Sequence, residues 1–365
     1  MITMVCGTRP ELIKLAPLLR HFGQDAALVY TGQHYDRSMY SQILDDLPEP
    51  GRFHEFAVGG VGRGAQLSQA VRVVDEVLRA FGAGAVLVQG DTTSALAGAL
   101  AANANGVPLV HVEAGLRSHD RAMPEEHNRV MIDHIADLCC VPTELNRRNL
   151  LAEGVAAERI ALTGNTVVEA LDAALPDSDE QQAVLDRHGL AVDGYAVATI
   201  HRPENVDDRS NLETVLRELA RLPLPVVLPL HPRTAKRIAE FGLGHVLAGL
   251  TVVEPQAYPA FLALARGAAV VVSDSGGIQE EVSVLKRPVV VVRRSTERPE
   301  IEGTFGTLVT PDRLHAEVLH WLHDIPGHRT RLARIPSPYG DNSTSKLIAM
   351  AVERLVAHAP ALAAP

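Results

Sequence analysis

Short runs of apolar, mostly β-branched residues recur along the 365-residue chain, and segments with the three-and-four spacing of a buried helix face lie between them. Buried strands that alternate with helices form parallel sheets covered on both faces. We therefore predict an α/β fold with doubly wound parallel sheets. The predicted strands are Ile2–Val5, Ala27–Tyr30, Ala85–Val88, Val107–Val112, Leu138–Val141, Ala196–Ile200, Val226–Leu230, Leu250–Val253, Val270–Val272 and Val289–Val292.

The length favours two domains, because a domain typically has roughly 150 residues. Residues 176–193 are rich in Asp, Gln and Ser and follow a helix expected to end near Leu175, so we place the hinge there. This predicts a Rossmann-like first domain at 1–175 and a Rossmann-like second domain at 176–340.

The C-terminal part has its own signals. The prolines of Ile335–Pro338 stop a helix and predict a second junction. The amphipathic segment 344–358 is expected to pack back on the first domain, and 359–365 to fray.

Composition limits the partners. The chain has 34 Lys and Arg against 44 Asp and Glu, a net charge of -10, and no basic run, which argues against a nucleic-acid partner. Cys6, Cys139 and Cys140 lack metal-ligand spacing and predict buried thiols in a reducing compartment. A strand begins at residue 2 and no apolar span reaches about 18 residues, so we expect a cytoplasmic protein without a membrane partner.

The stretch from Ser273 to Glu281 predicts a strand, a tight turn and a helix, because β-branched residues are followed by Gly276, Gly277 and helix formers. Two glycines let a ligand approach the backbone closely, and the N–H groups of the new helix point at it. A diphosphate suits such a corner, with Ser275 adding a hydroxyl. Glu281 lies about one turn further along the chain, where a carboxylate can accept the hydroxyls of a ribose.

Polar clusters follow many of the predicted strands, where parallel sheets bind their ligands. Taken singly, each has a plain structural explanation. Asp91 could cap the helix starting at Thr92, and Glu125 could favour a helix N-terminus. Taken together, the clusters predict a cleft between two facing domains. They are Gly7–Lys14, Gly32–His34, Gly90–Ser94, His111–Arg117, His201–Asn205, His231–Arg233 and Thr296–Glu300.

Nine motifs in chain order resemble the non-hydrolysing UDP-N-acetylglucosamine 2-epimerases, and the match runs from residue 5 to about residue 345, including Pro338–Asp341. The motifs are GTRPELIK, GDTTS, HVEAGLRS, MPEEHNR, PTE, TGNT, HRPEN, SDSGGIQEE and TERPE. The resemblance implies a two-domain fold of the glycosyltransferase-B type and a homodimer. It implies interconversion of UDP-N-acetylglucosamine (UDP-GlcNAc) and UDP-N-acetylmannosamine (UDP-ManNAc), without a metal or redox cofactor.

The resemblance also assigns roles to residues. It makes Asp91, Glu113 and Glu125 the acid/base candidates, with His201 near the reacting end. The positions that match substrate contacts are Arg9, Lys14, Gln256, Phe261, Ser275, Gly276, Gly277, Glu281 and Arg298. From sequence alone, Phe261 is as readily a core residue and Gln256 a solvated loop residue.

The implied chemistry eliminates UDP, leaves a bound 2-acetamidoglucal, and adds UDP back with the proton on the other face of C2. Elimination needs a base at C2 and donors that stabilise the departing diphosphate. Clustered carboxylates repel one another, which raises the pKa of at least one of them and lets it donate as well as accept a proton. The residues leave open which carboxylate removes the proton and which returns it.

Two segments depart from many members of the family, at 33–39 and at 117–124. These segments and three further residues resemble the region where some members bind a second, activating UDP-GlcNAc, and the departures argue against an intact second site. The residues matching that region are Gln33, His34, Arg202, Glu204 and His231.

Three alternatives remain from the sequence. The GLRS…MPEE form also resembles relatives that act on UDP-2,3-diacetamido-2,3-dideoxyglucuronate, for which Arg117 or Arg121 could supply a cation near C6. A nucleotide-sugar glycosyltransferase of the same fold would need an acceptor and gives no reason for Glu113 and Glu125 in their motifs. A non-catalytic nucleotide-sugar sensor would keep the glycine corner and lose the carboxylates.

Overall fold

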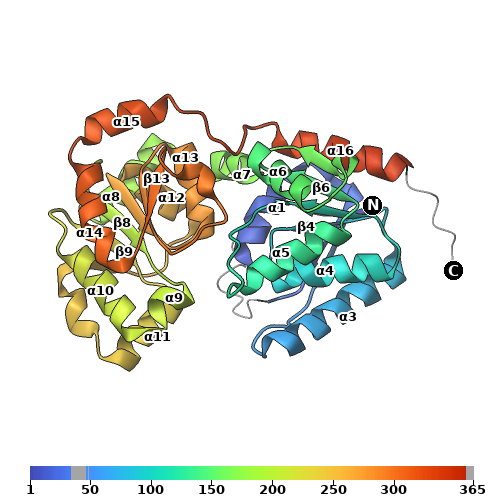
Figure 1. Cartoon of the computed structure of the whole chain (residues 1–365), viewed down its shortest axis with the longest axis horizontal. Helices are drawn as coiled ribbons and strands as arrows, with labels where there is room; N and C mark the ends of the chain where they lie inside the picture. The colour runs from blue at the N-terminus through green and yellow to red at the C-terminus, as the bar shows by residue number, and fades with distance from the viewer. Residues whose placement is uncertain (34–46, 48, 359–365) are drawn as a thin grey trace. The chain divides into compact units, whose positions relative to one another are not determined.

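The computed structural model describes residues 1–33, 47 and 49–358. The chain forms two compact units (Figure 1). Unit 1 combines Met1–Ala170 with Tyr339–Pro365, and unit 2 is Leu171–Pro338. Among the described helices, none has both the length and the apolar character needed to span a membrane.

Unit 1 is built on a seven-stranded sheet with the order β3-β2-β1-β4-β5-β6-β7. Its strands are β1 (Ile2–Cys6), β2 (Ala26–Tyr30), β3 (Arg52–Glu55), β4 (Ala85–Gln89), β5 (Leu109–Val112), β6 (Leu138–Val141) and β7 (Ile160–Leu162). Its helices are α1 (Arg9–Phe22), α3 (Arg63–Phe81), α4 (Thr93–Ala104), α5 (Pro124–Ile135), α6 (Glu144–Ala152), α7 (Val167–Ala174), which continues past Ala170, and α16 (Thr344–His358). Two short 3-10 helices are η1 (Gly23–Asp25) and η3 (Ala157–Arg159).

Alternate residues of each central strand of unit 1 enter different cores. Val5 packs in the core beneath α3 and α4, whereas Met4 and Cys6 pack with leucines of α1 and with Ile348 of α16. Figure 1 shows α1 and α16 on one side of this sheet and α3 and α4 on the other. The sheet is therefore doubly wound, and α16 supplies part of the core of unit 1.

Unit 2 contains a six-stranded sheet with the order β10-β9-β8-β11-β12-β13. Its strands are β8 (Ala196–Thr199), β9 (Val226–Pro229), β10 (Thr251–Val253), β11 (Val270–Ser273), β12 (Val289–Val292) and β13 (Gly306–Val309). Its helices are α8 (Ser178–Arg187), α9 (Pro203–Val206), α10 (Arg209–Ala220), α11 (Pro232–Phe241), α12 (Tyr258–Gly267), α13 (Gly276–Leu285), α14 (Leu314–Leu322) and α15 (Ile325–Ala333). Its 3-10 helices are η4 (Gly244–Gly249), η5 (Pro299–Ile301) and η6 (Pro311–Arg313).

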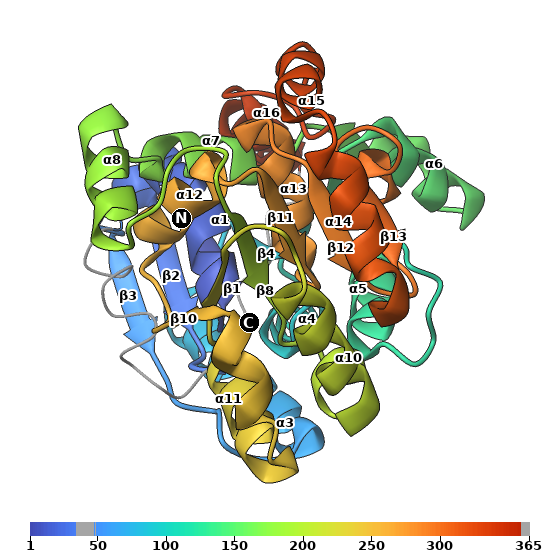
Figure 2. The ribbon, with the colours of Figure 1, turned by 90° about the vertical axis from the view of Figure 1, so that its left-hand side faces the viewer.

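Helices cover both faces of this second sheet as well. Val197 and Val227 pack with α8 and α12, while Ala196, Ala198 and the other face pack with α10 and α14. Figure 2 shows these two helix pairs on opposite sides of β8 and β11. Within the described residues every strand pair of both sheets is parallel, and the prediction of an α/β fold with two doubly wound parallel sheets is confirmed.

All ten predicted strands are present, and the structure adds β3, β7 and β13. The three additional strands lie at the edges of their sheets. β3 is largely exposed and reads Arg-Phe-His-Glu, so it carries no apolar run that a sequence pattern could detect. The region 176–193, predicted as a hinge, contains helix α8.

The order of strands reverses direction once in each sheet, between β1 and β4 in unit 1 and between β8 and β11 in unit 2. At such a switch point, the loops after the two strands separate and open a crevice at the carboxyl ends. The loops concerned begin at Gly7 and Gly90 in unit 1, and at Ile200 and Asp274 in unit 2. The folds alone therefore mark these loops as the places to look for ligand-binding residues.

Candidate active site

Glu113 is the most constrained of the predicted acid/base residues. It follows β5, has a backbone φ of 68°, and its side chain is almost fully buried. A positive φ is strained for any residue other than glycine, so tertiary contacts must hold Glu113 in place. Gly115, two residues later, packs so closely on the backbone of Asn146 that an added Cβ would lie 2.5 Å from its carbonyl oxygen.

Three donors converge on one oxygen of Glu113. The Lys14 Nζ lies 2.5 Å from Oε2, the Gln89 Nε2 lies 2.6 Å away, and the Asn165 Nδ2 lies 3.2 Å away. Lys14 is itself buried on α1, so the ion pair is largely shielded from solvent. A carboxylate held by a cation and two amides has a fixed orientation. A group that transfers a proton to or from one particular atom needs such an orientation.

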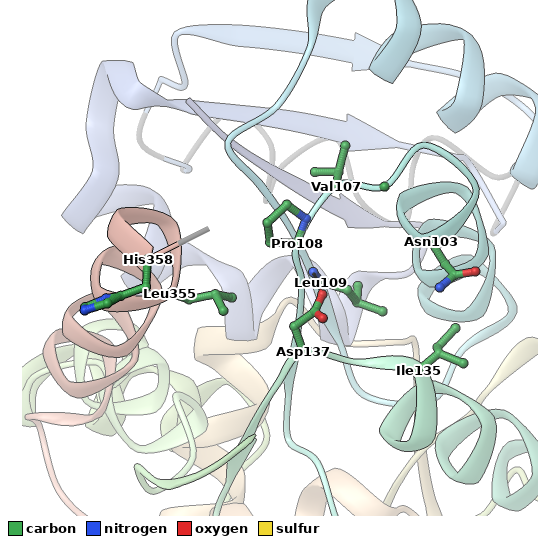
Figure 3. A pocket seen from close by; sticks show the side chains of 9 residues that line it. Asn103, Val107, Pro108, Leu109, Ile135, Asp137, Leu355 and His358 are labelled. Atoms are coloured by element: carbon green, nitrogen blue, oxygen red, sulfur yellow. Dashed lines mark hydrogen bonds between the residues drawn. The ribbon is translucent and has the colours of Figure 1, made fainter. Parts of the chain in front are cut away.

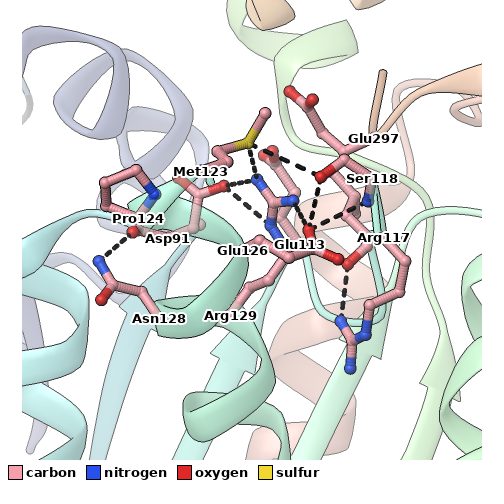
Figure 4. A network of polar contacts seen from close by, with 12 residues as sticks. Asp91, Glu113, Arg117, Ser118, Met123, Pro124, Glu126, Asn128, Arg129 and Glu297 are labelled. Atoms are coloured by element: carbon pink, nitrogen blue, oxygen red, sulfur yellow. Dashed lines mark hydrogen bonds and ion pairs between the residues drawn. The ribbon is translucent and has the colours of Figure 1, made fainter. Parts of the chain in front are cut away.

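Asp91 lies at the end of β4 and pairs with Arg129 of α5, whose Nε and Nη2 both contact its Oδ2, at 3.1 and 2.5 Å. The alternative that Asp91 caps α4 is wrong, because Thr92 is the N-cap and accepts the Ala95 N–H. The Asn128 Nδ2 also donates to the Asp91 carbonyl oxygen at 2.7 Å. Figure 4 shows Arg129 beside Asp91, with Asn128 on the other side of the aspartate.

The two glutamates at the start of α5 have different environments. Glu125 is exposed, whereas Glu126 is buried and forms an ion pair with Arg129. Burial opposes ionisation of Glu126, but the N–H groups of Ser118 and His119 and the Arg129 cation outweigh it and hold the pKa of Glu126 below its usual range. The sequence interpretation singled out Glu125, while the structure connects Glu126 to Asp91 through one shared arginine.

Arg9 and Gln33 lie at the same edge of the unit 1 sheet. Arg9 is the first residue of α1 and is half-buried. The Gln33 Oε1 accepts the backbone N–H of Ser94 at 3.1 Å and its hydroxyl at 2.9 Å, which ties the segment after β2 to the start of α4. His34, the neighbouring candidate for a second nucleotide site, lies outside the described residues.

Arg117 is unsuited to the role of a free cation near C6 of a uronic acid. Its guanidinium is buried and pairs with Asp133 at 2.7 Å and with Glu153 at 2.7 Å. Asp133 also contacts the His111 Nδ1 at 2.7 Å. Arg121, the other candidate cation, is exposed.

In unit 2, the glycine corner has the predicted form. β11 ends at Ser273, Ser275 is the N-cap, and α13 begins at Gly276. A Cβ at Gly276 would lie 2.6 Å from Arg298 Nη1 and from Glu297 Oε1, so side chains pack directly on that glycine. At Gly277 the nearest neighbour of an added Cβ is the Ser275 Oγ at 4.0 Å, so the first turn of α13 is open there. An open helix N-terminus favours an anion.

Asp274 organises the loops at this corner. It is fully buried and accepts the backbone N–H groups of His201 and Arg202, at 3.0 and 2.9 Å, and the Asn205 Nδ2 at 3.0 Å. The His201 Nδ1 lies 3.2 Å from Asp274. Burial lowers the pKa of His201 although Asp274 opposes this, so the imidazole is neutral near pH 7.

Arg298 belongs to a buried set of charges beside Gly276. Its Nε lies 2.8 Å from Glu280, and its Nη1 pairs with Glu297. Arg293 pairs with the same Glu297 at 2.8 Å, and burial lowers the pKa of Arg293. The predicted substrate contact Arg298 is thus fixed by two carboxylates next to the open helix terminus.

The predicted uridine-side residues are more loosely placed. The Glu281 Oε1 accepts the Tyr258 hydroxyl at 3.0 Å, which orients that half-buried carboxylate. Gln256 is half-buried in the loop before α12, with its amide on the Glu254 carbonyl oxygen at 2.7 Å. Phe261 is partly buried and packs against the core under α8 and α12. The core-packing interpretation of Phe261 therefore holds at least for part of its ring.

The residues of the suggested second site lie around α9 and α11. His231 caps α11 and stacks near His201, with ring centroids 5.1 Å apart. Arg202 is half-buried, with its Nη2 3.8 Å from Glu297, and Glu204 is exposed, with its Oε1 3.9 Å from Arg293.

A separate cavity in unit 1 lies away from all of these side chains. Its volume is about 390 Å³ and it is lined by Asn103, Leu109, Asp137, Leu355 and His358, among others (Figure 3). Leu109 is the first residue of β5 and Asp137 precedes β6. Asp91 and Glu113 follow the carboxyl ends of β4 and β5, at the opposite end of the strands. The cavity is therefore not part of the candidate site.

A family model for UDP-N-acetylglucosamine 2-epimerase matches residues 18–353 of the chain. The chain belongs to this epimerase family. The UDP-N-acetylglucosamine 2-epimerase of Methanocaldococcus jannaschii is 37% identical over 323 residues, which cover 85% of this chain and 88% of that protein.

Solved and curated epimerases support the same assignment. The crystal structure of the M. jannaschii enzyme in complex with UDP-GlcNAc and UDP matches with a TM-score of 0.84 and 32% identity, over 97% of this chain and 99% of that chain. This likeness confirms the predicted fold class, the glycosyltransferase-B type. The UDP-2,3-diacetamido-2,3-dideoxy-D-glucuronate 2-epimerase of Pseudomonas aeruginosa is 34% identical over 310 residues, covering 82% of this chain and 85% of that protein.

Three residues that organise the site lie within the family motifs, but the sequence patterns gave them no role of their own. Glu11 accepts the N–H groups of Gly7 and Thr8, at 3.0 and 2.8 Å, and the Thr92 hydroxyl at 2.6 Å, so it joins the loops after β1 and β4. Burial raises the pKa of Glu11 to about 7. Asp274 and Asn165 are the other two. The sequence shows the capping-box spacing between Thr8 and Glu11, but nothing in it indicates the bond between Thr92 and Glu11.

Proposed function

We propose that the chain interconverts UDP-GlcNAc and UDP-ManNAc without releasing free sugar. The observation that carries the proposal is the pair of oriented carboxylates, Asp91 after β4 and Glu113 after β5, in a family whose relatives are named for UDP-GlcNAc. The open N-terminus of α13 beside Arg298 supplies donors for a diphosphate.

The proposed reaction balances without a redox step. A carboxylate takes the proton from C2, the C1–O bond breaks with its electron pair leaving on UDP, and a C1–C2 double bond forms. Protonation of C2 from the other face and return of the UDP oxygen to C1 give the epimer. Asp91, Glu113 and Glu125 are the acid/base candidates and His201 is near the reacting end.

The substrate-binding roles are part of the same proposal. Ser275, Gly276 and Gly277 hold the diphosphate together with Arg9, Glu281 accepts the ribose hydroxyls, and Arg298 makes a further contact. Gln256 and Phe261 lie on the uridine side, and Lys14 orients Glu113. Each positioned acid or base typically contributes about 10²–10⁴-fold to such a rate.

Product analysis tests the proposed function. The purified chain is incubated with UDP-GlcNAc and the products are separated as nucleotide sugars and free sugars. We expect UDP-ManNAc at equilibrium with the substrate and no accumulation of free N-acetylmannosamine. Free sugar with UDP would indicate a hydrolysing enzyme, and turnover only with an added acceptor would indicate a glycosyltransferase.

A second candidate substrate is UDP-2,3-diacetamido-2,3-dideoxyglucuronate, because the P. aeruginosa relative that carries this activity in its name is 34% identical. Arg117 is already paired with Asp133 and Glu153, which leaves the exposed Arg121 as the other candidate cation for the uronate carboxylate. Parallel assays with both nucleotide sugars decide between them: a kcat/KM that favours the uronate would replace UDP-GlcNAc in the proposal.

We further propose a cytoplasmic homodimer that supplies a precursor for cell-surface polysaccharide. The family resemblance supports the dimer, and the three buried, unbridged cysteines fit a reducing compartment. Light scattering on the purified chain tests the first part: a mass near twice 39.2 kDa is expected, and a monomer at working concentration would contradict it.

A further inference from the structure

Asn165 uses both ends of its side chain. The residue is 1% exposed. The amide Nδ2 donates to Glu113 Oε2 at 3.2 Å, and the amide Oδ1 accepts the Val167 N–H at 3.0 Å, at the start of α7. Because the Val167 N–H can only donate, the oxygen of the amide must face it and the NH₂ group must face Glu113. The orientation of the amide is therefore fixed by the backbone.

The backbone of Asn165 is tied to a distant part of the chain. Its N–H donates to the Tyr339 carbonyl oxygen at 2.8 Å, where the chain re-enters unit 1. The neighbouring glycines make this close approach possible: a Cβ at Gly164, whose φ is 87°, would lie 2.9 Å from the Tyr339 oxygen, and one at Gly340 would lie 3.2 Å from the Gly164 Cα.

A second pair of bonds joins the same two segments. The Glu169 carboxylate of α7 accepts the Ser345 N–H and the Ser345 hydroxyl, each at 2.6 Å, at the first turn of α16. The segment that leads out of unit 1 and the segment that leads back into it are thus fixed side by side. Asn165 is the member of this arrangement that touches a candidate acid/base group.

We infer that Asn165 is a positioning residue for the reaction: its amide sets the orientation of the Glu113 carboxylate, and its backbone bond to Tyr339 anchors that orientation to the returning chain. The inference rests on the proposed function for its catalytic consequence. The contact between Asn165 and Glu113 does not depend on the proposed function, so it can be tested without measuring activity.

Asn165→Asp is the sharpest test, because it replaces one donor with an acceptor and keeps the rest. The aspartate still accepts the Val167 N–H and keeps the backbone bond to Tyr339. Its second oxygen, however, would face the Glu113 oxygen where an NH₂ group now stands, and two adjacent carboxylates resist joint ionisation. We expect the acid limb of the kcat profile to move up by about one pH unit or more, which lowers turnover on that limb at least about tenfold.

The matched control is Asn146→Asp in the same unit. Asn146 is also 1% exposed, and its Oδ1 accepts the Thr143 N–H at 3.0 Å, so an aspartate keeps the capping bond there too. The hydrogen bonds of its side chain are with Thr143. We expect the acid limb of this variant to coincide with that of the wild-type protein. A shift of equal size in both variants would contradict a specific role for Asn165.

A thermal double-mutant cycle tests the contact without any turnover. Melting temperatures are measured near pH 7.5 for the wild-type protein, Asn165→Asp, Glu113→Gln and the double variant. Asn165→Asp is expected to lower the melting temperature of the wild-type protein. In the Glu113→Gln background the same substitution is expected to lower the melting temperature by at most half as much, because only one carboxylate then remains at the contact. Equal losses in both backgrounds would overturn the inference.

The outcomes separate the two claims. A wild-type protein without epimerase activity contradicts the proposed function, and the thermal cycle still decides whether Asn165 holds Glu113. An active wild-type protein whose Asn165→Asp variant keeps an unchanged acid limb contradicts the positioning role alone. If Asn165→Asp does not fold by itself, recovery of folding in the double variant supports the contact, and failure to recover overturns it.

Discussion

The two units carry polar groups at equivalent places in their sheets but use them differently. In unit 1 the loops after β4 and β5 hold carboxylates that pair with cations, Asp91 with Arg129 and Glu113 with Lys14. In unit 2 the loops at the switch point hold a helix N-terminus that is open at Gly277 and flanked by Arg298. One fold plan therefore presents oriented carboxylates in one unit and an open helix N-terminus in the other.

This difference teaches how a doubly wound sheet divides binding from chemistry. The switch point gives each unit a crevice, and the residues placed in the loops decide what the crevice does. Backbone N–H groups and arginines suit a diphosphate, which needs charge stabilisation and little movement. Oriented carboxylates suit proton transfer at a single carbon. Substitutions of the unit 1 carboxylates should therefore change turnover, and substitutions at the start of α13 in unit 2 should change affinity.

The largest effect is expected for Glu113→Gln in unit 1. The amide keeps the shape but cannot accept a proton, so turnover should fall at least about a hundredfold while the affinity for UDP-GlcNAc changes little. Stopped assays give kcat and calorimetry gives the affinity. Glu153→Gln, which alters another ion-paired glutamate of the same unit, should leave kcat within about twofold. Near-normal turnover of Glu113→Gln would remove this residue from the mechanism.

A second prediction compares how the glutamates at the starts of α1 and α8, Glu11 and Glu180, affect stability as the pH changes. Burial raises the pKa of Glu11 from 4.5 to about 7, so the folded protein holds this proton more tightly than the unfolded chain does. The resulting stabilisation is full below about pH 4.5 and is lost as the pH rises to about 7, a change of roughly 3 kcal/mol. Relative to Glu11→Gln, the wild-type protein should therefore lose melting temperature across this range.

Glu180→Gln in unit 2 is the control for this pH series. Glu180 occupies the same capping-box position at the start of α8, where its carboxylate accepts the Asp177 N–H at 3.2 Å, but it is exposed. The melting temperature of the Glu180→Gln variant should follow that of the wild-type protein at every pH. If Glu11→Gln behaves in the same way, the buried carboxyl of Glu11 does not titrate between these pH values.

The smallest effect is expected for Gly276→Ala in unit 2. The new Cβ would lie 2.6 Å from Arg298 Nη1 and must displace that side chain from the helix start, so the dissociation constant for UDP should rise about tenfold, or 1.4 kcal/mol. The matched variant Gly244→Ala has nothing within 4 Å of its Cβ and should bind UDP as the wild-type protein does. Loss of kcat without loss of affinity would contradict the division between the units.

The sequence predicted the central strands of both sheets because buried parallel strands are continuous apolar runs, such as Val289–Val292. It did not predict β3, β7 or β13: β3 has no apolar run, β7 has only three residues, and β13 begins with Gly and Thr. The corner at Gly276 was predicted because its strand, turn and helix signals are all local.

The partners of the site residues were out of reach of local patterns. Lys14 and Glu113 are 99 residues apart, and only the pairing of β1 with β4 and of β4 with β5 brings their elements together. For the same reason the burial of Glu126 next to an exposed Glu125 was not foreseen, because two adjacent glutamates look alike until Arg129 and Asp91 are placed.

The central claim is that carboxylates of unit 1 move the hydrogen at C2 while unit 2 holds the nucleotide. Incubation with UDP-GlcNAc in D₂O, followed by NMR of C2, tests it most directly. The account predicts deuterium at C2 in the UDP-ManNAc formed by the wild-type protein, and a rate of incorporation at least about a hundredfold lower in Glu113→Gln. Epimer formed without deuterium at C2, or equal incorporation by both proteins, would contradict it.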